Sequence, residues 1–391
     1  MKRLKVVVID EAVPLPANTG KRIRTFNLLR GMAKRHDVTF LAFGDEDEAE
    51  GLRSSGIRCK VVSRFHNAMG MSLLARISAS LLTPYPYSVV KHHHREFQEA
   101  LDAELSHGCD LVHVEWTPYA RYATKDAKVV IGSHNIETDI WRRRADVASS
   151  VIAKRFFRGQ AVRMHNFERG AFHRADIVTV VSESDESQAR ALGAKHTKVV
   201  PNAVNPGEFA FSRQPVPAKF IFLGSLDWYP NEDAVKFLLR DILPRVKLPY
   251  TLDVVGRNPS EQLRRALAAN RSVQLHADVA DVRPYLRAAS AMLVPLRIGG
   301  GSRIKILESL ASALPVISTT VGAEGLDLQD GKEILLRDDV ERFVAAMEEV
   351  IQHPQMLNAL GAAGRERVIA EYTWDRSVEK LDEAWQEAVA R

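Results

Sequence analysis

The chain has 391 residues, of which 46% are apolar and 26% are charged, and this composition excludes a disordered or fibrous protein. The length is sufficient for two cores of ordinary domain size. The net charge of +5 permits anionic substrates or an anionic membrane surface and does not require nucleic acid as a partner.

Cysteine content and apolar runs bear on the compartment. The two cysteines, Cys59 and Cys109, lie in apolar strand-like surroundings, so we expect buried free thiols in a reducing compartment and no disulfide framework or zinc site. The first apolar run ends at Asp10, too early for a signal peptide, and no apolar run is long enough to span a bilayer. We therefore predict a cytoplasmic protein, either soluble or peripherally attached to the inner face of the cell membrane.

The first half of the chain alternates apolar runs with helical stretches, which is typical of an open parallel α/β sheet. After the first run comes the loop P-L-P-A-N-T-G, and then a helix is predicted over 21–34. Its apolar positions are Ile23, Phe26, Leu29 and Met32. The strands predicted here are Leu4–Ile9, Val38–Phe43, Ile57–Val62, Asp110–Glu115, Lys128–Ser133 and Asp176–Ser182.

A second α/β series follows the polar, proline-bearing linker Val200–Pro217. Its predicted strands are Phe220–Leu223, Thr251–Val255, Val273–His276, Ala291–Pro295 and Val316–Ser318. We predict two doubly wound domains, 1–203 and 204–373, with a last helix over 374–391 that packs back on the first domain. A small-molecule ligand is expected in the cleft between the domains, outside the carboxyl ends of strands.

One stretch, Pro295 to Val316, carries the clearest chemical signal. It reads as strand, glycine turn, helix and strand, with Gly299, Gly300 and Gly301 in the turn and a helix beginning near Ser302. Unpaired amides at a helix start form an anion site. Two cations in the first turn, Arg303 and Lys305, would be unfavourable there unless an anion binds, and a diphosphate fits.

Glu308 follows on the same helix, where its carboxylate could accept two hydrogen bonds from a ribose diol of the same ligand. The alternative is an ordinary strand-to-helix connection with a solvated basic helix start. Gly20, with Lys21 and Arg22 beside it, is a second place where a phosphate could contact backbone, at the end of the first strand's loop.

The order and spacing of several motifs resembles glycosyltransferase family 4 of the GT-B fold over essentially the whole chain. With the Pro295–Val316 stretch, the segments that carry this resemblance are N-T-G-K-R-I-R (18–24), S-H-N-I-E (133–137), V-V-S-E-S-D (180–185), V-P-N-A-V (200–204), F-L-G-S-L-D-W-Y-P-N (222–231), V-V-G-R (254–257) and A-D-V-A-D-V-R-P-Y-L (277–286). The resemblance implies two Rossmann-like domains facing each other across a cleft. It also implies a retaining enzyme that moves a sugar from a nucleotide diphosphate donor, held by the second domain, to an acceptor hydroxyl on the first.

Site residues are carried over from the same resemblance. Glu308 matches the glutamate that binds the donor ribose, Gly20 matches the loop glycine that faces the donor phosphates, and His134 matches a histidine beside the reacting sugar. The backbone near Asp278 and Val279 matches the segment that holds the base. Further donor-side positions in the quoted segments are Gly224, Ser225 and Arg257, and the acceptor-side candidates are Asn18, Arg22, Glu115, Asn135 and Glu137.

The chain departs from the family pattern at two places. Eight positions before Glu308, where the family has a glutamate that contacts the donor sugar, this chain has Gly300. The arginine and lysine that commonly follow the first strand of the second domain are missing from G-S-L-D-W-Y-P-N-E-D. We infer that Arg303 and Lys305 replace them in a bacterial exopolysaccharide-type subfamily.

The chemistry expected of this set is stabilisation of the leaving diphosphate by Arg303, Lys305 and the amides of 299–303, without a metal or other cofactor. His134 would support the sugar or its developing charge, or it is a strand-end histidine bonded to backbone. Glu115 lines the acceptor side or forms a structural salt bridge, and Asn135 and Glu137 contact the acceptor or cap a helix.

Two stretches of the first domain combine basic and apolar residues. One lies between Trp141 and Arg174, and Met69–Leu82 is similarly apolar. A helix of this kind can lie on an anionic membrane surface, and the acceptor would then be a lipid-linked saccharide. The alternative is a helix whose basic face is solvated and whose apolar stripe packs in an ordinary core. The run His92-His93-His94 lacks the spacing of metal ligands, and we expect a solvated helix entrance.

Two alternative functions fit the same fold. A nucleotide-sugar epimerase would need acid and base groups around the sugar and no acceptor groove. A non-catalytic nucleotide-sugar-binding subunit would account for glycine at position 300.

Overall fold

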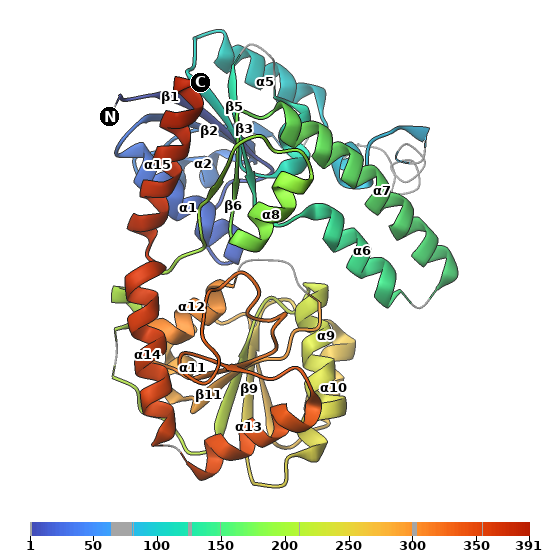
Figure 1. Cartoon of the computed structure of the whole chain (residues 1–391), viewed down its shortest axis with the longest axis vertical. Helices are drawn as coiled ribbons and strands as arrows, with labels where there is room; N and C mark the ends of the chain where they lie inside the picture. The colour runs from blue at the N-terminus through green and yellow to red at the C-terminus, as the bar shows by residue number, and fades with distance from the viewer. Residues whose placement is uncertain are drawn as a thin grey trace. The chain divides into compact units, whose positions relative to one another are not determined.

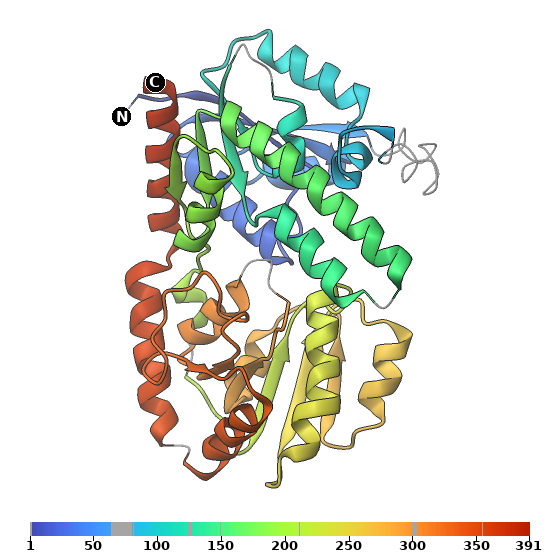
Figure 2. The same cartoon turned by 45° about the vertical axis from the view of Figure 1, so that its right-hand side comes forward.

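The computed structural model describes residues 2–63, 80, 82–123, 127–148, 150–210, 212–298, 303–353 and 355–391. The chain forms two compact units, one made of Met1–Pro201 with Trp374–Arg391 and the other of Asn202–Thr373. The glycine turn at 299–302 and most of the stretch Met69–Leu82 lie outside the described residues. Each unit is an α/β sandwich with its own core (Figures 1 and 2).

The first unit contains a seven-stranded parallel sheet in the order β3-β2-β1-β4-β5-β6-β7. Its strands are short β-branched runs buried on both faces, as parallel strands covered by helices require. They are β1 Lys5–Asp10, β2 Asp37–Gly44, β3 Arg58–Ser63, β4 Leu111–Val114, β5 Lys128–Ser133, β6 Ile177–Val180 and β7 Thr197–Val199.

Helices cover both faces of this sheet. One face packs with α5, α7 and α8 into a core that includes Ile9, Phe97 and Phe172, and α1 and α15 lie on the other face (Figure 1). The helices of this unit are α1 Gly20–Ala33, α2 Glu46–Arg53, α4 Tyr87–Lys91, α5 Arg95–Leu105, η2 Thr117–Arg121, α6 Glu137–Val147, α7 Val151–Arg174, α8 Glu183–Ala191 and α15 Trp374–Ala390.

The second unit repeats the architecture with a six-stranded parallel sheet in the order β10-β9-β8-β11-β12-β13. Its strands are β8 Lys219–Leu223, β9 Thr251–Gly256, β10 Val273–Ala277, β11 Ala291–Val294, β12 Val316–Ser318 and β13 Leu335–Leu336. Its helical segments are η3 Pro206–Phe209, α9 Tyr229–Phe237, η4 Leu238–Ile242, η5 Leu243–Arg245, α10 Glu261–Ala268, α11 Arg283–Ala288, α12 Ile304–Ala311, α13 Val340–Gln352 and α14 Met356–Glu371.

Both sheets have the strand order of doubly wound domains, so the prediction of two such domains is confirmed. Every predicted strand is present. The short strands β7 and β13 were not predicted, because two or three residues at a sheet edge carry no periodic signal. The order reverses between β1 and β4 in the first unit and between β8 and β11 in the second, and ligands bind at such switch points.

The buried face of α1 differs from the apolar stripe predicted for it. Leu29 and Met32 are buried, whereas Ile23 and Phe26 are partly exposed and the polar residues Arg24 and Thr25 are buried in their place. The hydrogen-bond partners of Arg24 and Thr25 explain this exchange. Arg24 donates to the carbonyl oxygens of Val200 and Pro201, and Thr25 donates to the carboxylate of Glu115.

Helix α15 is held beside α1 by packing and by one buried carboxylate. A side chain at Gly31 of α1 would collide with Val378, so glycine permits the close approach of the two helices. Asp382 of α15 is buried and accepts hydrogen bonds from Arg35 at 2.9 Å and from His36 Nε2 at 3.0 Å. The other ring nitrogen of His36 accepts the amide hydrogen of Leu4, so the bond to Asp382 anchors α15 to the start of the sheet.

We expect Asp382→Ala to lower the free energy of unfolding by roughly 2–4 kcal/mol, since the change leaves buried donors without their acceptor. Glu383→Ala is the matched control, because Glu383 on the same helix forms a largely exposed pair with Lys198 and should cost about 0–1 kcal/mol. Chemical denaturation of the intact protein measures both. Equal costs in the two variants would contradict the anchoring role of Asp382.

Candidate functional site

The loop before α1 places the first set of predicted residues at the carboxyl end of β1. Gly20 is the first residue of α1, and Thr19 caps the helix by accepting the amide hydrogen of Arg22 at 3.3 Å. The guanidinium of Arg22 donates to the carbonyl of Leu15, and the amide of Asn18 donates to that of Pro16. These bonds give the loop a defined backbone next to the switch point of the sheet.

Glu115 lies at the carboxyl end of β4 and is buried. One carboxylate oxygen accepts from His113 Nε2 at 2.8 Å, and the other accepts from Thr25 at 3.1 Å and lies 3.4 Å from His134 Nε2. Burial would raise the pKa of Glu115, but the bond from His113 and the neighbouring His134 hold it well below its usual range. Glu115 is therefore held in place by hydrogen bonds from His113 and Thr25.

His134 follows β5 directly and is mostly buried, with 13% of its side chain exposed. Burial lowers its pKa, and the charge of Glu115 opposes that effect. Among the described residues, His134 Nε2 is buried without a hydrogen-bond partner, although it lies 3.4 Å from the carboxylate of Glu115. The ring thus has one nitrogen directed toward Glu115.

Lys21 joins a second group of charges at the switch point. Its ammonium group contacts Asp10 at 2.7 Å and Glu11 at 2.8 Å and lies over the ring of Trp116, 4.8 Å from the centroid. Burial would lower the pKa of Lys21, but Asp10 and Glu11 raise it above its usual value. Burial also raises the pKa of Asp10 to about 6 against the attraction of Lys21. Lys21 therefore stays charged in this group.

Glu137 and Asn135 do not cap the helix that follows them. The N-cap position of α6 is Ile136, and the carboxylate that accepts the first amide hydrogens of the helix belongs to Glu168 of α7. Glu137 instead accepts the indole N–H of Trp116 at 2.8 Å. Burial raises the pKa of Glu137, against this bond and the charge of Lys21.

The three histidines 92–94 are half-buried among aromatic residues, unlike the solvated helix entrance that the sequence suggested. The ring of His92 meets Trp116 edge-on at 5.0 Å between centroids, and His93 lies at 5.0 Å from Tyr122. Burial lowers the pKa of His92 to about 4. These histidines extend the aromatic surroundings of Trp116.

In the second unit, Lys305 contacts the first turn of α9, the helix that follows β8. Its ammonium group donates to Asn231 Oδ1 at 2.7 Å, and Asn231 in turn donates to the carbonyl of Ser225 at 2.8 Å. The close approach of Asn231 explains Gly224, where a side chain would lie 2.8 Å from the Asn231 amide group. Lys305 thus lies against Asn231 of α9 and 5.1 Å from the ring centroid of Phe222 on β8.

Arg303 points in another direction. It is the N-cap residue of α12 and is buried, and its guanidinium donates to the carbonyl of Val321 at 2.9 Å and lies 3.4 Å from Glu324. The helix begins at Ile304, slightly later than predicted. Arg303 therefore contacts the loop after β12, whereas Lys305 contacts the first turn of α9.

Glu308 lies one turn beyond Lys305 on α12. Within the described part of the chain its carboxylate has no hydrogen-bond partner, and burial with the nearby charge of Glu208 raises its pKa to about 7. Burial, with the nearby charge of Arg303, lowers the pKa of Lys305 to about 7. Both groups therefore change charge near neutral pH.

The remaining donor-side residues follow β9 and β10. The carbonyl of Arg257 accepts the amide hydrogen of Leu226, and Asp278, at φ 56°, accepts the amide hydrogen of Asn258 at 3.0 Å. Asp278 is exposed and Val279 is partly buried. These loops thus lie with Gly224 and Ser225 at the carboxyl ends of the strands.

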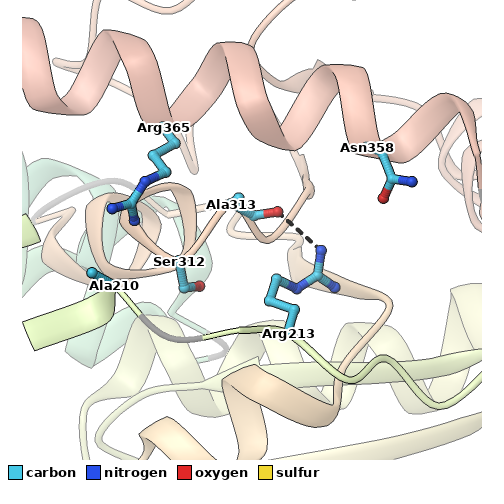
Figure 3. A pocket seen from close by; sticks show the side chains of 6 residues that line it. All are labelled: Ala210, Arg213, Ser312, Ala313, Asn358 and Arg365. Atoms are coloured by element: carbon cyan, nitrogen blue, oxygen red, sulfur yellow. Dashed lines mark hydrogen bonds between the residues drawn. The ribbon is translucent and has the colours of Figure 1, made fainter.

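A pocket of about 340 Å³ opens at the other end of α12 (Figure 3). Arg213 donates to the carbonyl of Ala313 at 2.9 Å, and Arg365 donates to that of Ala311. These carbonyls belong to the end of α12, where cations satisfy acceptors that a helix leaves unpaired. We therefore assign both arginines a structural role.

Sequence reasoning placed Lys21 only beside a possible phosphate contact, and it missed Trp116, Asn231 and the histidine partner of Glu115. The signal was available in part, since His113 is a polar residue inside an otherwise apolar strand and Asn231 lies in the quoted W-Y-P-N segment. Their partners come from distant parts of the chain, which no local pattern encodes.

The surface of α7 retains the basic and apolar character seen in the sequence. Val151, Ile152 and Val162 are 76%, 82% and 63% exposed, and Arg155 and Arg158 are exposed beside them. Helices α6 and α7 run side by side (Figure 2). None of the helices in the described part of the chain is long and apolar enough to cross a bilayer. Of Met69–Leu82 only Ser80 and Leu82 are described.

We expect Asn231→Asp to raise the pKa of Lys305 from about 7 toward its ordinary value, because a carboxylate would then face the ammonium group. NMR titration of ¹³C-labelled lysine measures this, with Lys305→Met to assign the signal. Asn358→Asp on α14 adds the same charge elsewhere in the unit and should leave the pKa of Lys305 unchanged. A Lys305 signal that titrates at an ordinary lysine pKa in the unmodified protein would contradict the described surroundings.

Two family models match the chain. The model described as Glycosyltransferase Family 4 matches residues 20–208, and the model described as Glycosyl transferases group 1 matches residues 217–353. The chain is 28% identical over 299 residues to the GDP-mannose-dependent alpha-(1-6)-phosphatidylinositol monomannoside mannosyltransferase of Mycobacterium tuberculosis, covering 64% of this chain and 76% of that one. It is 24% identical over 223 residues to the MMP alpha-(1->4)-mannosyltransferase of Mycolicibacterium hassiacum, covering 55% and 54%.

Solved structures extend the likeness to the whole chain. Sucrose-phosphate synthase from Thermosynechococcus elongatus matches with a TM-score of 0.75 at 16% identity, over 99% of this chain and 100% of that one. Anabaena HepE in complex with UDP and glucose matches with a TM-score of 0.67 at 12% identity, over 98% and 100%. At such identities the likeness shows the fold alone. With the family models, it establishes that the chain is a glycosyltransferase of family 4 with the GT-B fold.

Proposed function

We propose that this glycosyltransferase uses a nucleotide diphosphate sugar as donor and transfers the sugar with retention of anomeric configuration, without a metal. The observation that carries the donor assignment is the position of Lys305. Its ammonium group lies on Asn231, at the switch point between β8 and β11, with Glu308 one turn further along the same helix. In this arrangement the cation of Lys305 would bind the diphosphate, and the carboxylate of Glu308 would bind the ribose of the same donor.

The leaving group requires most of the electrostatic help. Cleavage of the bond between sugar and diphosphate places negative charge on the phosphate oxygens, and a fixed ammonium group stabilises that charge. Lys305 supplies it, while Arg303 holds the loop after β12 through Val321. Because this cation stands at the leaving group, a divalent ion is not needed for charge neutralisation.

Retention would follow if the acceptor hydroxyl attacks the sugar on the same face from which the diphosphate leaves. His134, with Nε2 toward Glu115, is positioned to accept a hydrogen bond from a sugar hydroxyl or to stabilise the positive charge that develops on the sugar. Glu115 is already bonded to His113 and Thr25. It is therefore a poorer nucleophile than an open carboxylate would be.

The acceptor is proposed to be a saccharide of the cell surface or one linked to a lipid, in polysaccharide biosynthesis. One of the mycobacterial relatives is a phosphatidylinositol monomannoside mannosyltransferase. The exposed valines, isoleucine and arginines of α7 suit peripheral contact with an anionic inner membrane surface. Trp116, with Glu137 on its indole N–H, offers an aromatic surface for a sugar ring.

We expect saturable binding of one nucleoside diphosphate, measured by calorimetry, and a loss of at least about tenfold in affinity for Glu308→Ala and for Lys305→Met. A bound diphosphate raises the pKa of Lys305, so affinity falls as the pH rises above about 7. Ribose hydroxyls favour ionised Glu308, so affinity also falls below about pH 7. Lys305→Met should remove the loss of affinity at alkaline pH, and Glu308→Gln should reduce the loss of affinity at acid pH.

Glu324→Gln is the control for loss of a carboxylate in the same unit. If neither Lys305→Met nor Glu308→Ala weakened binding, the donor assignment would be wrong.

Turnover of the identified donor, followed by proton NMR of the product, should show the anomeric configuration of the donor sugar, and a chelator should leave the rate unchanged. An inverted product would refute retention.

Binding to vesicles tests the membrane contact. We expect the protein to sediment with vesicles that contain phosphatidylglycerol and not with pure phosphatidylcholine, and Arg155→Ala and Arg158→Ala should each weaken binding about fivefold. Ile152→Glu should weaken it further. Val216→Glu, at an exposed valine of the second unit, is the matched control. Equal binding to both kinds of vesicle would exclude the electrostatic contact.

A further inference from the structure

A chain of hydrogen bonds runs from helix α15 to Glu115, and His134 lies beside its end without a hydrogen bond of its own from Nε2. The indole N–H of Trp385 donates to His113 Nδ1 at 3.1 Å, and His113 Nε2 lies 2.8 Å from one oxygen of Glu115. The other oxygen of Glu115 lies 3.4 Å from His134 Nε2. Trp385, His113 and Glu115 are almost completely buried, at 1%, 2% and 4% exposure. The chain runs through the side of the sheet that α1 and α15 cover.

The direction of these bonds fixes the tautomer of His113. An indole N–H can only donate, so His113 Nδ1 must be the acceptor and carry no hydrogen. A neutral imidazole has one N–H, which must therefore be on Nε2, facing Glu115. His113 is thus locked as a neutral donor to the carboxylate, and it cannot take a second proton without losing the bond from Trp385.

The orientation of Glu115 depends on this donor. Its two oxygens are held by His113 on one side and by Thr25 on the other. The oxygen that accepts from Thr25 also faces His134 Nε2, which favours a hydrogen on Nε2 and leaves Nδ1 as the acceptor of the ring. At 3.4 Å the contact is longer than a well-formed N–H···O bond. Catalytic hydrogen bonds in unliganded structures commonly have this length and shorten when the substrate binds.

We propose that Trp385 is a positioning residue for His134, acting through the tautomer of His113 and the orientation of Glu115. The C-terminal helix would then set the chemistry at the carboxyl end of β5 in addition to its packing role. The proposal deepens the function assigned to His134 above and rests on it for its catalytic consequence. The tautomer it requires is independent of that function.

Other charged groups near this chain are fixed by partners of their own. On α1 these are Arg24, bonded to the carbonyls of Val200 and Pro201, and Lys21, bonded to Asp10 and Glu11. His36 and Asp382 form their own pair, and the ring of His36 lies 5.5 Å from that of Trp385. A phenylalanine at position 385 would keep an aromatic ring in this place and remove the N–H together with one ring of the buried indole. Trp385→Phe is therefore the informative substitution.

NMR of ¹⁵N-histidine-labelled protein tests the tautomer directly, with His113→Gln and His134→Gln to assign the signals. In the unmodified protein we expect His113 as the Nε2–H tautomer across neutral pH. In Trp385→Phe the nitrogens of His113 should exchange or average, and the His134 signals should shift. Trp374→Phe removes an indole from the same helix and should leave both unchanged. A His113 that carries its hydrogen on Nδ1 in the unmodified protein would overturn the proposal.

Kinetics with the donor and acceptor found above test the catalytic consequence. Trp385→Phe should lower kcat roughly tenfold or more, with KM little changed, because only the orientation of His134 is altered. In a His113→Gln background, where glutamine donates to Glu115 and has no tautomers, Trp385→Phe should have no further effect. An equal loss in both backgrounds would show a packing effect and refute the relay. If the tautomers were as expected and kcat unchanged, the role of His134 would be wrong instead.

Discussion

A single buried carboxylate organises the polar interior of the first unit. Glu115 keeps its charge inside a sheet of apolar strands because His113 and Thr25 donate to it and His134 lies beside it. An unpaired charge there would be too costly to bury. The residues that satisfy Glu115 come from β4, α1 and β5, and Trp385 of α15 completes the set. This requirement explains why α1 buries Thr25 where a continuous apolar stripe was expected.

The second unit buries a positively charged group, Lys305, where the first unit buries a carboxylate. Lys305 is a cation at the start of a helix, where the helix dipole disfavours positive charge, and its low pKa follows from burial there. Asn231 accepts one of its hydrogens and is itself fixed by Ser225. The ammonium group is therefore held in place before any anion arrives. Preorganisation of this kind costs nothing further when charge develops on a leaving group.

Both clusters lie where the strand order of their sheet reverses. In the first unit Glu11 and Glu115 follow β1 and β4, and in the second Ser225 and Lys305 follow β8 and β11. At these points neighbouring connections run to opposite faces of the sheet and leave room at the strand ends. The solved structures share this fold although their sequences are only 16% and 12% identical to the chain. The fold depends on the pattern of apolar strands and not on particular side chains.

The sequence by itself determined the strands, the doubly wound class and the chain segments that carry the site, since strand periodicity and glycine turns are local signals. The pairing of side chains was decided only by the tertiary structure. Arg303 and Lys305 are two positions apart, yet one contacts the loop after β12 and the other contacts helix α9 after β8. Trp385 and His113 are 272 positions apart and share one hydrogen bond. Such contacts depend on how helices pack across the sheet, and no local pattern records them.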